Sequence, residues 1–448
     1  MDQLKEDFKK IVEIAQQDKA EVELLLSNQE NLILKYSQKK LTKFESTLSL
    51  MAGLRVILGS KQGYAYTENL SAEALFRTYK EALNNAKSLT SVPGESALPL
   101  ARPQSKIPRL DLYTPVEIPL EKKMEIARSL EQACLSADSR VDSVPYSGFS
   151  EVVSTTRVIN SAGLDQKYQQ NYYSGYCYPL VKSTDSSKMS GDSFFLRSFK
   201  DIDVEKLAQE SVHKAISRLG AKKIPTGNYA VVIDREQFPM IMAMFADYLS
   251  AKKVEEGKSL FHDRLNKKVS SELLSVTDDP LDPCSPAARP FDDEGSPSQK
   301  TPLIERGILT HFLTNLEYAK KMQIPHTANA SRSPSSTMDI APSNLVISQG
   351  EKTLQELLTI HEQVIYLTHF SGGLHSGYKE STGDFSMPAE GFLYEKGLCL
   401  HPIDQTVMSG NILDLLLNIE ELGCEYGKPN QSMMSPDVLI KSVGFAGI

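Results

Sequence analysis

The spacing of apolar residues changes twice within the first 90 residues, and this change restricts the fold more than any other feature. Residues 4–15 place apolar side chains three and four positions apart, which predicts an amphipathic helix. Residues 21–67 instead contain short runs with a strand-like period, EVELLLS, NLILKYS, KLTKFESTLSLMAGLRVILG and QGYAYTE, separated by polar or glycine-containing turns. A second helical stripe follows at 71–88. Helices flanking an antiparallel meander of short strands indicate an α+β layer arrangement.

The chain is long enough for two hydrophobic cores. Its 448 residues exceed the usual size of one domain. The segment GAKKIPTG, at 220–227, places two glycines and a proline between a helical pattern and the strand YAVVID, so we expect a domain boundary there. We predict an N-terminal α+β domain at 1–222 and a C-terminal domain at 223–448, each with a mainly antiparallel sheet and packed helices.

Further helices, a strand and a long loop are predicted along the chain. The helical patterns lie at about 120–137, 204–219, 236–256, 354–361 and 411–422. The C-terminal run DVLIKSVGFAGI predicts a strand. The Asp- and Pro-rich segment 277–298 predicts a loop whose carboxylates are solvated rather than bound to a cation.

Charge, cysteine content and hydropathy exclude several classes of protein. The chain has 49 Lys and Arg against 57 Asp and Glu, a net charge of −8, and no basic tract that would bind nucleic acid or a membrane surface directly. Its five cysteines are far apart and form no CxxC pair, which is typical of a reduced cytoplasmic protein. The start MDQLKEDFKK is too polar for a signal peptide, and no apolar stretch has the length of a membrane span.

Familiar catalytic motifs are missing. The sequence has no GxxxxGK[ST] or GxGxxG phosphate-binding loop and no GxSxG nucleophile turn. His361 and Glu362 form a lone His–Glu pair with no second imidazole one turn later. His369 and His375 flank the glycine-rich stretch SGGLHSG and could meet in space as an atypical metal site. The residues alone therefore name no active site.

Two long stretches nevertheless resemble the signatures of the TldD/PmbA family, also called the modulator of DNA gyrase family. These are PFDDEGSPSQKTPLIERGILTHFLTNLEYAKK at 290–321 and STGDFSMPAEGFLYEKGLCLHPIDQTVMSGNILDLLLNIEELG at 381–423. The runs SLFHDRLNKKVSSELLSVTDDP, SPDVLIKSVGFAGI and GLRVILGSKQGYAYT fit the same family. The resemblance spans nearly the whole chain and implies a metallopeptidase-like C-terminal domain.

The resemblance further implies which kind of family member this is. TldD-like members are similar to zinc metallopeptidases with an HExxxH motif on a helix early in the second half, whereas PmbA/TldE-like members lack it. In this chain the motif positions fall at Met242, Ala243 and Asp247, and no histidine occurs between His213 and His262. The region EYGKPNQSMMSPD also lacks the cysteine of catalytic members. The chain resembles the PmbA/TldE kind, so we expect no catalytic residue and no metal on it.

This resemblance implies a non-catalytic subunit that pairs with a TldD-like, zinc-bearing partner to process peptides, with a homodimer as the alternative assembly when the chain is alone. The candidate cleft or interface residues lie in the two signature loops and the glycine-rich stretch: Asp292, Asp293, Glu294, Gly383, Asp384, Phe385, Ser386, His369 and His375. The two loops could instead be turns that define the fold. The alternatives are an autonomous metallopeptidase that uses His369, His375 and loop carboxylates, and a non-enzymatic modulator of DNA gyrase.

Overall fold

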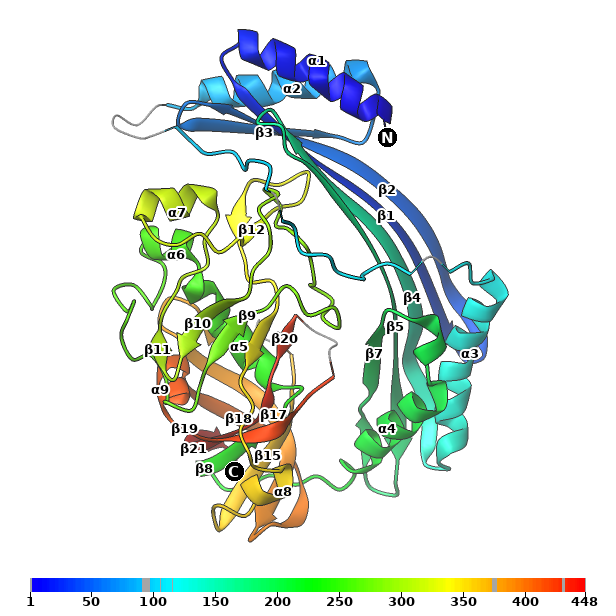
Figure 1. Ribbon diagram of the computed structural model, residues 1–448. Coiled ribbons are helices and arrows are strands. Elements are labelled where there is room, and N and C mark those ends of the chain that lie inside the picture. The colour runs from blue at the N-terminus through cyan, green and yellow to red at the C-terminus, as the bar shows by residue number, and fades with distance from the viewer. Residues whose placement is uncertain are drawn as a thin grey trace.

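The computed structural model describes residues 2–90, 97–104, 106–114, 116–372, 377–428 and 432–447. The long strands of the first half curve around one side of the second half (Figure 1). None of the described helices has the length and hydropathy needed to span a membrane. The architecture is α+β with mainly antiparallel sheets, which confirms the predicted fold class.

The first half contains one antiparallel sheet and four α-helices among its described residues. In chain order its elements are α1 (Asp2–Gln17), β1 (Glu21–Ser37), β2 (Lys40–Leu58), β3 (Lys61–Thr67), α2 (Ala72–Ser88), α3 (Leu120–Ala137), β4 (Val141–Asn160), β5 (Asp165–Lys182), β6 (Ser187–Met189), β7 (Asp192–Leu196), the 3-10 turn η1 (Phe199–Asp201) and α4 (Val204–Ile216). The sheet order is β3-β2-β1-β4-β5-β6, and β7 also pairs with β5.

The strands of this sheet are much longer than the predicted short runs. EVELLLS and NLILKYS form the single 17-residue strand β1, and β2, β4 and β5 have 19, 20 and 18 residues. The polar residues between the two runs do not end β1, because β2 and β4 pair with them on both sides. Asn28, for example, lies opposite Leu50 on β2 and Thr155 on β4. The prediction of short strands was therefore wrong.

Helices cover the two ends of the sheet and bury two separate cores (Figure 1). At one end α1 and α2 pack against the strands, with Phe8 and Tyr79 buried in a shared apolar cluster. At the other end α3 and α4 bury Leu130 and Leu207 around Phe149 of β4. The predicted helices at 4–15, 71–88 and 120–137 are confirmed, and α4 ends three residues before the predicted limit.

The second half has many short elements around one large core. They are β8 (Gly227–Ile233), α5 (Phe238–Ala246), η2 (Asp247–Leu249), α6 (Ala251–Glu255), β9 (Val276–Asp278), β10 (Thr301–Glu305), β11 (Ile308–Leu309), α7 (Leu316–Met322), β12 (Ala330–Ser331), β13 (Asp339–Ile340), β14 (Leu345–Ile347), α8 (Leu354–Leu357), β15 (Gln363–Phe370), β16 (Tyr378–Lys379), β17 (Asp384–Glu395), β18 (Leu398–Asn411), α9 (Ile412–Leu417), β19 (Ile419–Tyr426), β20 (Met433–Met434) and β21 (Pro436–Ala446).

The main sheet of the second half closes on itself. Its order is β15-β8-β21-β18-β17-β16, and an additional pairing between β15 and β17 completes a ring. A smaller sheet, β11-β10-β9-β14-β20, and the β12–β13 pair lie beside it. Among the described residues, no named strand of the first sheet pairs with one of the second half, so contact between the halves depends on side chains and loops.

Two predicted helices of the second half are interrupted. The helix expected at 236–256 is divided into α5, η2 and α6, because Ser250 is extended and forms a β-bridge with Leu313. The helix expected at 411–422 ends after α9, and the following residues IEELGCEY form β19 against β21. In both places pairing with a distant segment overrides the local helical pattern.

Candidate functional site

The helix α5, to which the resemblance assigns the metal motif of TldD-like proteins, is packed into the main core of this chain. Met242 on α5 is fully buried in the main core, Ala243 is half-buried, and Asp247 is exposed at the start of η2. The Asp247 carboxylate lies 3.7 Å from the Lys253 ammonium group. These three positions offer a thioether, a methyl group and a solvated carboxylate, which together form no zinc-ligand set.

The acidic loop is buried rather than solvated, so the expectation of solvent-exposed carboxylates was wrong for its main members. Asp292 and Glu294 are fully buried, and Asp293 is half-buried. Asp292 Oδ1 accepts hydrogen bonds from the backbone N–H groups of Glu294 at 3.1 Å and Ser296 at 2.8 Å, while Oδ2 accepts one from Ala330 at 3.1 Å. These donors replace water and make burial of the carboxyl group possible.

Asp278, in β9 at the start of the same segment, is also buried. Its Oδ1 accepts hydrogen bonds from the backbone N–H groups of Ser343 and Asn344, both at 2.8 Å. Its Oδ2 accepts a hydrogen bond from the Asn329 side-chain amide at 2.6 Å. Burial raises the pKa of Asp278, while these donors and Arg289 oppose the increase. The Asp- and Pro-rich segment is thus an ordered structural element around its acidic side chains.

Glu294 belongs to a buried charge network that joins the two halves of the molecule. Its Oε1 lies 3.0 Å from Nη1 of Arg55 on β2. Arg55 also lies 3.7 Å from Glu23 on β1, and Glu23 lies 2.8 Å from Nη2 of Arg332, which follows β12. The side chains of Glu23, Arg55, Glu294 and Arg332 are all completely buried. We define these four residues as the interface charge network.

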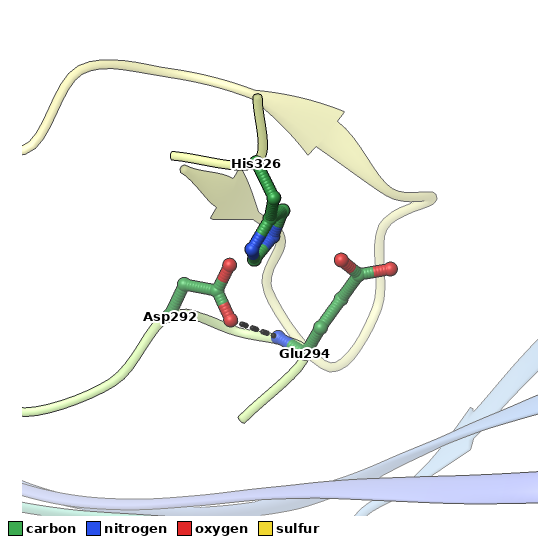
Figure 2. Close-up of side chains that lie close together, drawn as sticks. All are labelled: Asp292, Glu294 and His326. Atoms are coloured by element: carbon green, nitrogen blue, oxygen red, sulfur yellow. Dashed lines mark hydrogen bonds between the residues drawn. The ribbon is translucent and has the colours of Figure 1, made fainter. Parts of the chain in front are cut away.

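Asp292, Glu294 and His326 form the one group of His, Cys, Asp or Glu side chains with metal-like spacing among the described residues. Their candidate ligand atoms lie within 4.8 Å of one another (Figure 2). Burial lowers the pKa of His326, which favours the neutral imidazole, and its buried Nε2 has no hydrogen-bond partner. Two carboxylates and a neutral imidazole are ligand types that suit zinc or manganese.

The hydrogen bonds of this trio fit a structural junction better than a metal centre. Glu294 Oε1 is bound to the Arg55 guanidinium group, and its Oε2 accepts a hydrogen bond from Leu316 N at 3.0 Å. Both Asp292 oxygens already accept backbone N–H groups. Burial and the nearby Glu294 charge raise the pKa of Asp292 well above its usual range, which favours the neutral carboxyl form. A cation would have to displace these donors in the presence of Arg55.

A separate cavity of about 570 Å³ lies between α4 and the β6–β7 region of the first half and the closed sheet of the second half. The start of α5 contributes Gln237 and Pro239 to its wall. Met433, Met434 and Ser435 line the same cavity from the segment where catalytic members are expected to carry a cysteine. Residues 429–431 of that segment lie outside the described part of the chain. The cavity therefore lies beside both regions to which the resemblance assigns the metal ligands of TldD-like proteins.

Ion pairs between the two halves line this cavity. Lys428 Nζ lies 2.6 Å from both Asp192 on β7 and Glu210 on α4. Lys214 Nζ lies 3.1 Å from Asp192 and 2.9 Å from Glu236. Burial alone would raise the pKa of Asp192, but Lys214 and Lys428 hold it below its usual value. The cavity wall thus carries ion-paired ammonium and carboxylate groups.

A second polar group in the cavity wall surrounds Asp234, which follows β8. Tyr366 donates a hydrogen bond to Asp234 Oδ2. Asp437 on the neighbouring β21 accepts a hydrogen bond from Arg235 N at 2.9 Å. Burial and the Asp234 charge raise the pKa of Asp437 to about 6. Of these residues, Asp234, Arg235 and Tyr366 line the cavity and provide hydrogen-bonding groups, without a nucleophile paired to a base.

His369 lies in the cavity wall, whereas His375 lies outside the described residues. Burial and the neighbouring Arg218 guanidinium group lower the pKa of His369. Among the described residues, His369 belongs to no group with metal-like spacing. The side chain of His361, which the sequence pairs with Glu362, forms a hydrogen bond with Glu420, with Nε2 and Oε2 2.6 Å apart. The described residues therefore do not assemble the atypical metal site considered from the sequence.

The other signature loop forms a turn at the start of β17 and does not line the cavity. Gly383 has a φ of 78°, a backbone conformation that favours glycine. Exposed Asp384 accepts hydrogen bonds from Thr382 Oγ1 at 2.7 Å and Asn411 Nδ2 at 2.9 Å. Phe385 is buried in the main core, and Ser386 is exposed. The structure does not bring this loop together with Asp292, Asp293 and Glu294.

The sequence did not identify the residues that surround Asp292 and Glu294 in the folded chain. Glu23 and Arg332 lie 309 positions apart in the chain, with Arg55 between them, and His326 follows Glu294 by 32 residues. None of them belongs to a recognisable local motif. The sequence marks these residues in one way, because a charged residue such as that in VELLL or GLRVIL interrupts an otherwise apolar strand. Such a charge needs a buried partner, but the pattern does not identify it.

Family models cover most of the chain. Residues 22–86 match the PmbA/TldA metallopeptidase domain 1, residues 113–219 the central domain, and residues 226–447 the C-terminal domain. Metalloprotease PmbA of Escherichia coli O157:H7 is 24% identical over 433 residues, which covers 96% of this chain and 92% of that protein. A PmbA homologue of Haemophilus influenzae is 26% identical over 409 residues and covers 91% and 88%, respectively.

Solved structures have the same fold. A Thermotoga maritima protein described as a candidate modulator of a DNA gyrase is 25% identical, with a TM-score of 0.89 over 99% of this chain and 100% of that one. TldE from Thermococcus kodakarensis has a TM-score of 0.88 at 18% identity, and the match covers 98% of this chain and 100% of TldE. The chain therefore belongs to the PmbA/TldD family of metallopeptidase-like proteins.

Proposed function

We propose that this chain is a PmbA/TldE-like subunit that lacks a catalytic metal and completes the peptide-binding cleft of a TldD-type zinc metallopeptidase. The observation that carries the proposal is the set of residues at the metal-motif positions on and after α5. The resemblance assigns the motif positions to buried Met242 and half-buried Ala243 on α5 and to exposed Asp247 at the start of η2. Without imidazoles zinc has no ligands there, and without a carboxylate at position 243 no base polarises a bound water.

The cavity supports the peptide part of the proposal. It lies between the two halves of the chain, and its walls combine ion-paired Lys214 and Lys428 with apolar Met433 and Met434. Mixed apolar and polar walls suit an extended peptide, whose backbone needs hydrogen bonds and whose side chains need apolar contacts. We propose that the partner supplies the zinc and that this chain contributes part of the wall of the peptide-binding cleft. The five free thiols suit a cytoplasmic complex.

The test combines metal analysis with peptide hydrolysis, performed on the chain alone and on a mixture with a TldD-like subunit. We expect no stoichiometric metal and no hydrolysis from the chain alone, and hydrolysis or altered peptide preference from the mixture. Bound zinc together with turnover by the chain alone would overturn the proposal and favour an autonomous peptidase.

A matched pair of variants tests the cavity. Lys428→Ala removes the cation shared by Asp192 and Glu210, so we expect it to raise the KM of the mixed complex for peptide. Lys268→Ala removes a surface ion pair with Glu272, neither of which lines the cavity, and should leave KM unchanged. Equal KM values for the two variants would show that the cavity does not bind the peptide.

A further inference from the structure

The closed sheet of the second half presents aromatic side chains to the cavity between the two halves. Tyr366 on β15 lies directly opposite Phe392 on β17, and Tyr394 follows two residues later on the same face of β17. All three residues are half-buried and line the cavity. The neighbouring residues Ile365 and Leu393 point to the other face of the sheet and belong to the main core. The three rings therefore lie on the outer face of the sheet.

The first half contributes apolar side chains from the opposite side of the cavity. Tyr178 on β5 is 37% exposed and Met189 on β6 is 43% exposed, and both line the cavity. Phe392 belongs to none of the hydrophobic cores that the described residues form. Its ring is thus available to a ligand. We define Tyr178, Met189, Tyr366, Phe392 and Tyr394 as the apolar lining.

Two rings of the apolar lining are held in a fixed arrangement. Tyr366 donates a hydrogen bond to Asp234, which restricts the orientation of its ring. This ring contacts that of Tyr394 edge to face, with ring centroids 6.5 Å apart and an interplanar angle of 78°. A further aromatic ring can pack against such a pair in the same geometry. Side chains that are fixed before binding lose little conformational freedom when a ligand enters.

The size and chemistry of the cavity suit one aromatic side chain together with the backbone that carries it. The volume of about 570 Å³ lies within the range of small-ligand sites. Ion-paired Lys214 and Lys428 line another part of the same cavity. The apolar lining offers burial to a ring, and the polar groups offer hydrogen bonds to the flanking peptide amides.

We propose that the apolar lining is a subsite for an aromatic side chain of a bound peptide, and that Phe392 and Tyr394 determine this preference. The subsite rests on the proposed peptide-binding role of the cavity and makes that role more specific. It concerns binding by this chain alone and requires neither zinc nor hydrolysis.

Isothermal titration calorimetry of the full chain, without a partner subunit, measures the preference. The probes are the capped pentapeptides acetyl-GSFSG-amide and acetyl-GSLSG-amide, which differ only in the central side chain. We expect the Phe peptide to bind at least about threefold more tightly, because contacts between rings add to the apolar area that either side chain buries. N-acetylphenylalaninamide should bind at least about tenfold more weakly than the Phe peptide, because it lacks the flanking amides.

A matched pair of variants locates the subsite. Phe392→Ala removes one ring of the apolar lining, and we expect the affinity for acetyl-GSFSG-amide to fall at least about fivefold. Phe76→Ala removes a phenylalanine on α2 that is 39% exposed and does not line the cavity, so it should leave the affinity unchanged. Circular dichroism establishes that both variants are folded.

Thiol labelling provides a second measurement that needs no substitution. Cys399 on β18 is exposed, pairs with Tyr394 across the strands and lines the cavity. Cys284 is also exposed but does not line the cavity. We expect saturating acetyl-GSFSG-amide to slow the reaction of Cys399 with iodoacetamide and to leave the reaction of Cys284 unchanged.

Several outcomes would overturn the subsite: no binding of the pentapeptides, equal affinity for the Phe and Leu peptides, equal affinity of the two variants, or unchanged labelling of Cys399. Equal affinity for N-acetylphenylalaninamide and the Phe peptide would also overturn it, because the apolar lining would then bind a small aromatic molecule. Failure of the proposed function gives a different result, in which this chain binds the Phe peptide but its mixture with a TldD-like subunit hydrolyses no peptide.

Discussion

Arg55 donates a hydrogen bond to Glu294 across the interface between the two halves, with Nη1 and Oε1 3.0 Å apart and both side chains completely buried. Arg55 comes from β2 of the long sheet, and Glu294 comes from the acidic loop. This contact, together with Glu23 and Arg332, links the concave side of the first half to the second half. The acidic signature loop therefore acts as a junction between the halves.

The first prediction concerns this junction. Arg55→Ala leaves the Glu23 and Glu294 carboxylates buried without their shared cation. We expect the free energy of unfolding to fall by about 3–5 kcal/mol, the usual effect of breaking a buried ion pair. Urea unfolding followed by circular dichroism measures it. Lys268→Ala, which breaks an exposed pair, should change stability by only about 0–1 kcal/mol. Similar midpoints for the two variants would contradict the assignment.

The second prediction concerns the close approach of the halves at Gly53. A Cβ atom at this position would lie 2.1 Å from the backbone oxygen of Pro334. Gly53→Ala should force the two backbones apart and cost about 1–3 kcal/mol. At Gly227 an added Cβ meets its nearest neighbour at 3.7 Å, so Gly227→Ala is the control. Thermal unfolding compares the two proteins, and a Gly53→Ala variant as stable as the control would exclude a tight contact.

The third prediction is a pH dependence of stability that arises at Asp437. Burial and the Asp234 charge raise its pKa from the usual 3.8 to about 6 in the folded state. Between these values the folded protein binds the proton more tightly, so this stabilising contribution is complete at low pH and is lost as the pH rises through about 6. The cost of the charged form at neutral pH is on the order of 3 kcal/mol.

Asp437→Asn keeps the acceptor for Arg235 N and cannot ionise. We expect the melting temperature of the unmodified chain, relative to this variant, to fall between about pH 4 and pH 7. A constant difference over that range would show that Asp437 does not titrate with the raised pKa.

The fourth prediction is an order of thiol reactivity. Cys284 and Cys399 are exposed, whereas Cys134 and Cys177 are buried. A hydrogen bond with Cys177 and burial raise the pKa of Cys134, and burial raises that of Cys399. Since the thiolate is the reactive form, iodoacetamide should modify Cys284 first, Cys399 more slowly and the buried pair only after unfolding. Mass spectrometry of labelled peptides checks this order, and early labelling of Cys134 would contradict the packing around α3.

The helical stripes at both ends of the first half were predictable from sequence because local periodicity determines which face of a helix is apolar. The 120–137 pattern matches α3 from its first residue to its last. The α+β class followed from the same reasoning, and the long signature stretches indicated the family. The assignment of the motif positions to Met242, Ala243 and Asp247 stays a prediction, but the absence of histidine between His213 and His262 is a property of the sequence itself.

Only the tertiary structure decided how long the strands are, where two helices stop and which charges are buried. Asn28 stays in β1 because neighbouring strands pair on both sides of it, and IEEL forms β19 because β21 lies beside it. The burial of Glu294 depends on Arg55, which lies 239 positions away in the chain. Local sequence determines periodicity and available chemistry, whereas strand pairing and desolvation depend on segments that only folding brings together.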